Sequence, residues 1–163
     1  MKGFFNSSIG KKLIMSITGL FLIAFLLVHA GLNSLILVDV LLDTGGEHYN
    51  TAAHFMASNP IMKVLEPILG LGFVIHIFYG VLLEIQNMIA RGGSRYSKFN
   101  QKKSSKWVSR KMIYLGGIIL VFLVMHIINF FWKIKFGGAP EIKGTDMHDT
   151  YKLVTSLFSI WWY

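Results

Sequence analysis

Three histidines stand singly in three long apolar segments of this chain: His29, His76 and His126. An imidazole in the hydrocarbon of a bilayer costs free energy, so such a residue by default indicates a functional site. Because each segment supplies one histidine, a metal would have to be shared between helices. A haem iron suits this arrangement, since it takes one axial imidazole from each face of the ring. A compact three-histidine zinc site suits it less well, because three ligands and supporting carboxylates would have to surround one point.

A haem with both axial positions filled has no place for oxygen, so the predicted chemistry is electron transfer without substrate chemistry. Small or amide side chains lie one turn from a histidine on the same helical face: Asn33, Gly72, Gly80 and Asn129. The two glycines are expected to leave a groove beside His76 that admits a flat macrocycle. Lys133, two turns beyond His126, is placed to pair with a haem propionate.

These residues also have plainer explanations. Glycines in membrane helices mostly serve helix packing, and a lone intramembrane histidine can hydrogen-bond across a helix interface. The haem interpretation is favoured because the three histidines occupy three separate segments. The remaining histidines lie in polar loops, where we expect no such role: His48, His54 and His148.

The apolar segments predict helices at about residues 13–38, 61–90 and 112–132, each long enough to cross a hydrocarbon core of roughly 30 Å. The first is too long for the h-region of a signal peptide, so we expect it to be retained. Asn59 and Pro60 form a good start for the second helix. An acidic turn then predicts a last helix over residues 146–163, shorter than a span.

The chain has 163 residues, of which 53% are hydrophobic. This composition predicts an all-α membrane protein, a transmembrane helical bundle with three full spans and the start of a fourth. We expect a single domain over residues 1–163 and a C-terminal part that is missing. The chain contains no cysteine, which excludes disulfides, iron–sulfur clusters and thiolate metal sites built from its own residues.

The net charge of +8 is concentrated in short segments that flank the apolar runs. This placement argues against nucleic acid as a partner and for a lipid bilayer. The largest group lies between the second and third helices: Arg91, Arg95, Lys98, Lys102, Lys103, Lys106, Arg110 and Lys111. By the positive-inside rule, this loop and the lysine-bearing N-terminus are cytoplasmic, and residues 39–59 lie outside.

Depth in the membrane pairs two of the histidines. Counted from the cytoplasmic ends of their helices, His29 lies about 24 Å deep and His126 about 21 Å deep, at about 1.5 Å per residue. They are therefore predicted to share one haem toward the outer face. The depth of His76 stays open, because the pattern does not fix the inner end of its helix.

Three strings carry a resemblance to a known family. They are SSIGKKLIMSITGLFLIAFLLVHAGLN at residues 7–33, LEPILGLGFVIHIFYG at 65–80 and SSKWVSRKMIYLGGIILVFLVMHIINF at 104–130, followed by DTYKLV at 149–154. With these strings the chain resembles the di-haem cytochrome b membrane anchor of succinate dehydrogenase and fumarate reductase. The likeness is to the single-subunit, Bacteroidetes-like type and covers nearly the whole chain.

The resemblance implies a five-helix bundle that holds two b haems, each with two histidine ligands. Carried over by position, His29 and His126 are the iron ligands of the outer haem, and His76 is a ligand of the inner haem. The partner of His76 in the family lies on a fourth helix, beyond Tyr163. This chain therefore completes at most one bis-histidine site.

The implied function is to pass electrons between a membrane quinone and flavoprotein and iron–sulfur subunits on the cytoplasmic face. The dicarboxylate chemistry belongs to those subunits, so no catalytic residue is expected in this chain. Glu66 is a candidate for proton handling at a quinone site, although an interfacial carboxylate is the plainer explanation. The basic loop with Ser104, Ser105 and Trp107 is a candidate docking surface, or an ordinary positive-inside loop.

The resemblance further implies a multi-pass protein of the bacterial inner membrane with a cytoplasmic N-terminus. Menaquinone is the quinone that it favours, and the direction of the reaction stays open. One alternative is the cytochrome b anchor of another quinone-linked enzyme, such as a formate dehydrogenase or a hydrogenase. A second is a haem-free structural or transport subunit with hydrogen-bonded histidines, which predicts a colourless protein.

Overall fold

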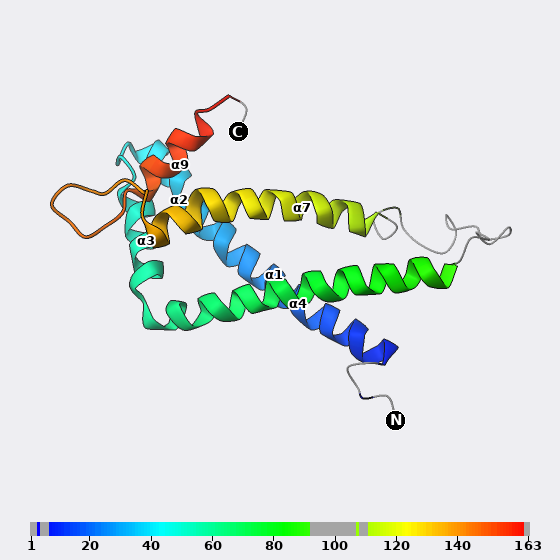
Figure 1. The fold of residues 1–163 in the computed structure, drawn as a ribbon. Coiled ribbons are helices and arrows are strands. Elements are labelled where there is room, and N and C mark those ends of the chain that lie inside the picture. Colours follow the sequence, from blue (N-terminus) through cyan, green and yellow to red (C-terminus); the bar gives the residue numbers. More distant parts are fainter. Residues whose placement is uncertain (1–2, 4–6, 92–106, 108–110, 162–163) are drawn as a thin grey trace. The chain divides into compact units, whose positions relative to one another are not determined.

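The computed structural model describes residues 3, 7–91, 107 and 111–161 (Figure 1). Within these residues every regular element is helical, and the only pairing of strand type is an isolated antiparallel bridge between Glu141 and His148. In the described part of the chain, three helical stretches are long and apolar enough to cross a membrane: Ser8–Leu42, Pro60–Ala90 and Met112–Phe136. The prediction of an all-α protein with three such helices is confirmed. Most of the basic loop lies outside the described residues.

The first long stretch consists of α1 (Ser8–Asn33) and α2 (Leu35–Leu42). It begins five residues before the predicted start because Ser7 caps it: the Ser7 hydroxyl accepts a hydrogen bond from the Gly10 amide at 3.0 Å. The stretch is interrupted at Ser34, whose hydroxyl donates to the Gly31 carbonyl at 2.6 Å. A serine and glycine pair of this kind is a common site of a helix break.

The helix α3 (Glu47–Ser58) leads into α4 (Pro60–Arg91). The predicted start of α4 is confirmed, since the Asn59 side chain accepts from the Ile61 amide at 2.9 Å and Pro60 occupies the first turn. Pro67 lies inside α4. A proline there removes one backbone hydrogen bond and is a recognised cause of helix kinks.

The third long stretch is not a uniform α-helix. It consists of α7 (Met112–His126), the π-helix η2 (Ile127–Trp132) and α8 (Lys133–Phe136). The π-helical turns begin directly after His126. Such turns are rare in proteins and occur often at functional sites.

The last helix, α9 (Thr150–Phe158), begins four residues later than predicted. Residues 141–148 form a turn closed by the Glu141–His148 bridge, so the acidic turn at Asp146 is not helical. Asp149 is the actual cap, and its side chain accepts from the Lys152 amide at 2.9 Å. With 9 residues, α9 is far shorter than a membrane span.

By their contacts the residues divide into two parts. The first part is Met1–Ile23 with Leu69–Phe122, and the second part is Ala24–Ile68 with Leu123–Tyr163. Segments of α1, α4 and the third long stretch contribute to both parts. The prediction of a single domain stays a prediction.

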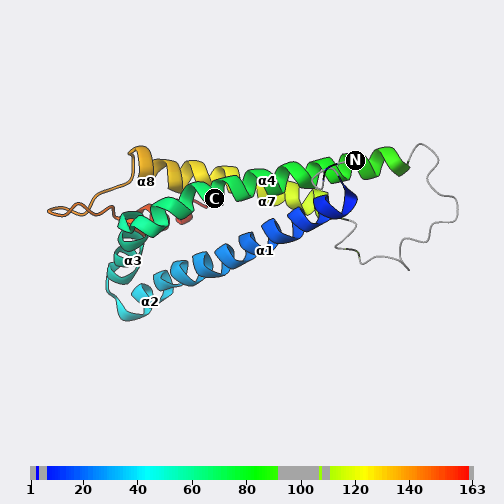
Figure 2. The same cartoon turned by 90° about the horizontal axis from the view of Figure 1, so that it is seen from below.

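In the second part, the packing partners are α2 with α3 (Figure 2) and α3 with α9 (Figure 1). Asp39 in the middle of α2 is 1% exposed and joins α2 to α3. Its carboxylate accepts hydrogen bonds from the Thr44 hydroxyl, from the His48 amide and Nδ1 at 3.0 and 2.8 Å, and from the Tyr49 amide at 2.8 Å. Four donors on one buried carboxylate fix the corner between the two helices.

Asn50 on α3 joins that helix to α9 by hydrogen bonds, as Asp39 joins α2 to α3. Its side chain is buried, and its Oδ1 accepts from the Thr150 hydroxyl and the Tyr151 amide, both at 2.8 Å. Its Nδ2 donates to the Asp149 carboxylate at 3.2 Å. The Asn50 side chain thus accepts hydrogen bonds from two donors in the first turn of α9 and attaches that helix to α3.

Candidate functional site

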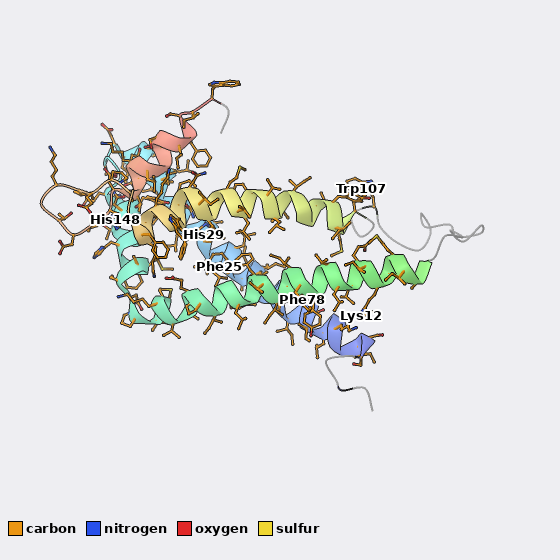
Figure 3. The ribbon with its side chains drawn as sticks, in the orientation of Figure 1. Lys12, Phe25, His29, Phe78, Trp107 and His148 are labelled. Carbon is orange, nitrogen blue, oxygen red and sulfur yellow. The ribbon has the colours of Figure 1, made fainter. Side chains whose placement is uncertain are left out.

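The second part brings His29 of α1 and His126 of α7 together. Their ring centroids are 5.6 Å apart and their planes are nearly perpendicular, at 87°. Each imidazole also packs on an aromatic ring of its own helix. Phe25 stacks on His29 with a centroid distance of 5.2 Å (Figure 3). Phe130 packs on His126 with a centroid distance of 5.0 Å. Two imidazoles from distant points of the chain therefore meet between two phenylalanines.

Asn33 holds the helix at His29 and does not point a free amide at the pair. Its Nδ2 donates to the His29 carbonyl at 2.7 Å, and its Oδ1 accepts from the Tyr49 hydroxyl at 3.0 Å. Burial raises the pKa of Tyr49, so the phenol stays protonated and keeps this bond at neutral pH. Tyr49 is anchored in turn through its amide on Asp39, so α3 positions the turn that carries His29.

The π-helix changes the place of the residues expected beside His126. Its hydrogen bonds span five residues and not four, so the seven-residue spacing that sets Lys133 above His126 in an α-helix does not do so here. The Lys133 side chain instead lies against Gly138, where an added Cβ would be 3.7 Å from the Lys133 Cγ. Asn129 lies within the π-helical turns, with a half-buried side chain.

Glu66 forms an ion pair that the sequence did not indicate. The Lys135 ammonium lies 2.9 and 2.8 Å from the two carboxylate oxygens of Glu66. Both side chains are partly exposed, 38% for Glu66 and 47% for Lys135. The carboxylate proposed for proton handling therefore has a cationic partner on α8.

His76 lies in the first part, against two consecutive residues of α1. The Thr18 hydroxyl oxygen is 3.0 Å from His76 Nδ1. A Cβ added to Gly19 would lie 3.4 Å from His76 Cε1, so the glycine leaves room for the edge of the imidazole. Thr18 and Gly19 were not predicted as site residues, although both belong to the first of the family-like strings.

The two glycines expected to form a macrocycle groove beside His76 face α1. A Cβ on Gly72 would come within 2.9 Å of the Phe21 ring, and one on Gly80 within 3.7 Å of the Met15 methyl. The Phe21 ring occupies the space that Gly72 leaves. In this structure Gly72 serves close helix packing, which is the plainer of its two explanations.

His48 and His54 were expected in a loop but lie on α3, and neither they nor His148 belong to the histidine pair or to the Thr18–His76 contact. His48 pairs with Asp39, His54 is exposed on α3, and the Nδ1 atom of His148 is buried without a hydrogen-bonding partner among the described residues. In the described part of the chain, no three histidine, aspartate or glutamate side chains converge as a metal ion would require.

Comparisons of the chain with protein families, with curated proteins and with solved structures found no match.

Proposed function

We propose that this chain is a haem b-binding membrane subunit of the succinate dehydrogenase and fumarate reductase anchor type. It would pass electrons between a membrane quinone, with menaquinone favoured, and iron–sulfur and flavoprotein subunits on the cytoplasmic face of a bacterial inner membrane. The observation that carries the proposal is the meeting of His29 and His126. Two single intramembrane histidines that meet across helices are an economical way to build a bis-imidazole metal site.

The dimensions of the pair suit such a site. An imidazole nitrogen lies about 2.0 Å from a bound metal ion, so imidazoles on opposite faces of a haem have centroids roughly 6 Å apart. The observed 5.6 Å is close to that distance. The rings meet edge to face, so one of them would have to turn for both to aim a ring nitrogen at an iron between them. The flanking Phe25 and Phe130 supply the apolar walls that a porphyrin prefers.

Different residues of the chain would have different roles at this site. His29 and His126 would hold the iron, and a haem held in this way supplies one-electron transfer with no open coordination position. Asn33 and Tyr49 keep the turn at His29 in place, because the Asn33 amide donates to the His29 carbonyl and the Tyr49 hydroxyl donates to the Asn33 amide oxygen. His76 would be a ligand of the second haem that the resemblance implies.

Glu66 is proposed as the proton-handling group near the quinone. The Lys135 ammonium beside it gives the carboxylate a partner when it is ionised. Loss of a proton from Glu66 would therefore form the ion pair with Lys135, and gain of a proton would break it, near the N-terminal end of α4. Docking of the hydrophilic subunits is proposed for the basic loop, and its Trp107 side chain is exposed.

Haem content tests the proposal. Membranes containing the chain are expected to show a reduced-minus-oxidised haem b spectrum and a pyridine haemochrome. His29→Ala and His126→Ala should each abolish the haem held by this pair, whereas His54→Ala, on the exposed face of α3, should leave it intact. A folded, inserted chain without haem would overturn the proposal, and so would haem that survives both substitutions.

A haem-free membrane subunit is the second candidate. The Thr18–His76 contact and the filling of the Gly72 space by Phe21 are what a bundle held by hydrogen bonds and close packing would show. This candidate predicts a colourless protein in which His76→Ala lowers stability without any spectral change. The same membranes and the same spectra separate the two candidates.

A further inference from the structure

The Thr18 hydroxyl has its single proton committed to its own helix. It donates to the Ile14 carbonyl at 2.8 Å, with the Met15 carbonyl a further 3.3 Å from the same oxygen. Threonines inside helices commonly form this bond to the carbonyl four residues earlier. Thr155 in α9 makes the same two contacts at nearly the same distances, 2.9 Å to the Tyr151 carbonyl and 3.3 Å to the Lys152 carbonyl, and among the described residues it has no hydrogen bond to a histidine. The bond of Thr18 is therefore a property of the helix.

A hydroxyl that has given its proton away can only accept. The Thr18 oxygen lies 3.0 Å from His76 Nδ1, so the bond between them requires a proton on Nδ1. A neutral imidazole protonated on Nδ1 carries its lone pair on Nε2. Among the described residues, His76 Nε2 has no hydrogen-bonding partner that would compete for that lone pair.

Gly19, the next residue of α1, lies beside the same imidazole ring. A Cβ added to Gly19 would lie 3.4 Å from His76 Cε1, so this edge of the imidazole lies close to α1. The ring is thus held along one edge, with Nδ1 on Thr18 and Cε1 over Gly19. Nε2, on the far side of the ring from Nδ1 across Cε1, is the nitrogen left to point elsewhere.

We propose that Thr18 is a positioning residue that holds His76 as the Nδ1-protonated tautomer and thereby presents Nε2 to a haem iron. This inference rests on the proposed function for the identity of the metal group. Metal-bound histidines are generally oriented by a hydrogen bond from the other ring nitrogen, which fixes the tautomer and raises the basicity of the ligand. Thr18 supplies that bond from a helix 58 residues away along the chain.

The first test reads the tautomer directly, without haem. Haem-free chain labelled with 15N at histidine is placed in lipid nanodiscs at about pH 8, where an ordinary imidazole is neutral. His76 is assigned by the signal lost in His76→Gln. We expect Nδ1–H in the wild type and in Thr18→Ser, which keeps the hydroxyl. In Thr18→Val we expect the preference to be lost, with Nε2–H appearing.

The control is Thr155→Val, which removes a threonine hydroxyl with the same bond inside its helix and should leave His76 unchanged. Thr18→Val is nearly isosteric, and the Ser variant guards against a general fault in folding. The inference is overturned if His76 is protonated on Nε2 in the wild type, or if Thr18→Val has the wild-type tautomer.

The second test reads the metal. In chain that binds haem through His76, Thr18→Val should shift the midpoint potential of that haem to more positive values, because a less basic ligand stabilises ferric iron less. Thr18→Ser and Thr155→Val should not shift it. An Nδ1–H tautomer in a chain that binds no haem overturns the proposed function and leaves the role of Thr18 on the imidazole standing. Haem bound at His76 with an unchanged potential in Thr18→Val overturns this inference alone.

Discussion

The imidazoles of His29 and His126 touch edge to face, with centroids 5.6 Å apart and planes at 87°. This is the preferred geometry of two aromatic rings, and such pairs contribute about 0.5–1.5 kcal/mol beyond their burial. The contact therefore holds the helices together even without a metal. The same two rings carry both packing and the proposed coordination, and these roles can be separated by substitution.

Replacing His29 with phenylalanine separates them. Phenylalanine keeps a ring against His126 but has no nitrogen to bind iron. We expect His29→Phe to change the free energy of unfolding in detergent by less than about 1 kcal/mol, because the ring contact persists. The haem b absorbance of this site should vanish. Thermal unfolding and haemochrome content are measured on the same preparation, and full haem content in His29→Phe would remove His29 from the ligands.

Substitution of Gly72 tests the packing in the first part. Alanine would place its Cβ 2.9 Å from the Phe21 ring, which is too close for either side chain to stay where it is. We expect Gly72→Ala to destabilise the protein by about 1–3 kcal/mol, as overpacked sites generally do. The double variant Gly72→Ala with Phe21→Leu should recover part of that loss. Gly70→Ala is the matched control, because nothing lies within 4 Å of a Cβ at Gly70.

The long helices follow from the sequence because their signals are local. An apolar run of sufficient length predicts a membrane span, and Asn59 with Pro60 marks a helix start whatever else the chain does. The break at Ser34 and the extension back to Ser8 were missed, since each depends on one short side-chain bond. The boundary of α9 was misplaced because the Glu141–His148 bridge takes residues that the acidic turn had assigned to the helix.

The surroundings of the histidines were harder to predict. Thr18 meets His76 across 58 residues and Tyr49 meets Asn33 across 16, and no periodicity within one helix indicates such pairs. The π-helix after His126 is equally hidden, so the α-helical spacing that placed Lys133 two turns beyond His126 does not hold there. For Gly72, the sequence showed that space would be left, and only the fold shows that Phe21 fills it.

Loss of Asn50 should release α9 from α3. Asn50→Ala leaves the Thr150 hydroxyl and the Tyr151 amide without their acceptor in a buried place, which costs about 1–3 kcal/mol for each such group. We expect faster hydrogen–deuterium exchange over residues 150–158, with the exchange of α4 unchanged. Asn50→Asp keeps the acceptor but sets a carboxylate against Asp149, so an intermediate effect is expected. Wild-type protection of α9 in Asn50→Ala would contradict this account of its docking.

The corner between α2 and α3 should weaken in alkali because of Tyr49. Burial raises the pKa of its phenol, so above about pH 10 the unfolded chain releases this proton before the folded protein does. The stability that the raised pKa of Tyr49 contributes at lower pH is therefore lost as the pH rises through the pKa of Tyr49 in the folded protein. Tyr49→Phe should remove this part of the decline in unfolding free energy. Asn33→Ala should keep it, because burial and not the Asn33 bond is its cause.

The pair between Glu66 and Lys135 allows the proton-handling proposal to be tested against simple ion pairing. Partly exposed pairs contribute about 0–1 kcal/mol, so Glu66→Gln and Lys135→Met should both leave stability and haem content nearly unchanged. If Glu66 carries a proton for the quinone, Glu66→Gln should slow the reduction of haem by a menaquinol analogue at least tenfold. Glu66→Asp should restore part of the rate, and Lys135→Met should retain most of it. Lys135→Met keeps the Glu66 carboxylate, which is the group that takes up and releases the proton. Equal slowing in Glu66→Gln and Lys135→Met would therefore assign the effect to the ion pair and not to proton transfer by Glu66.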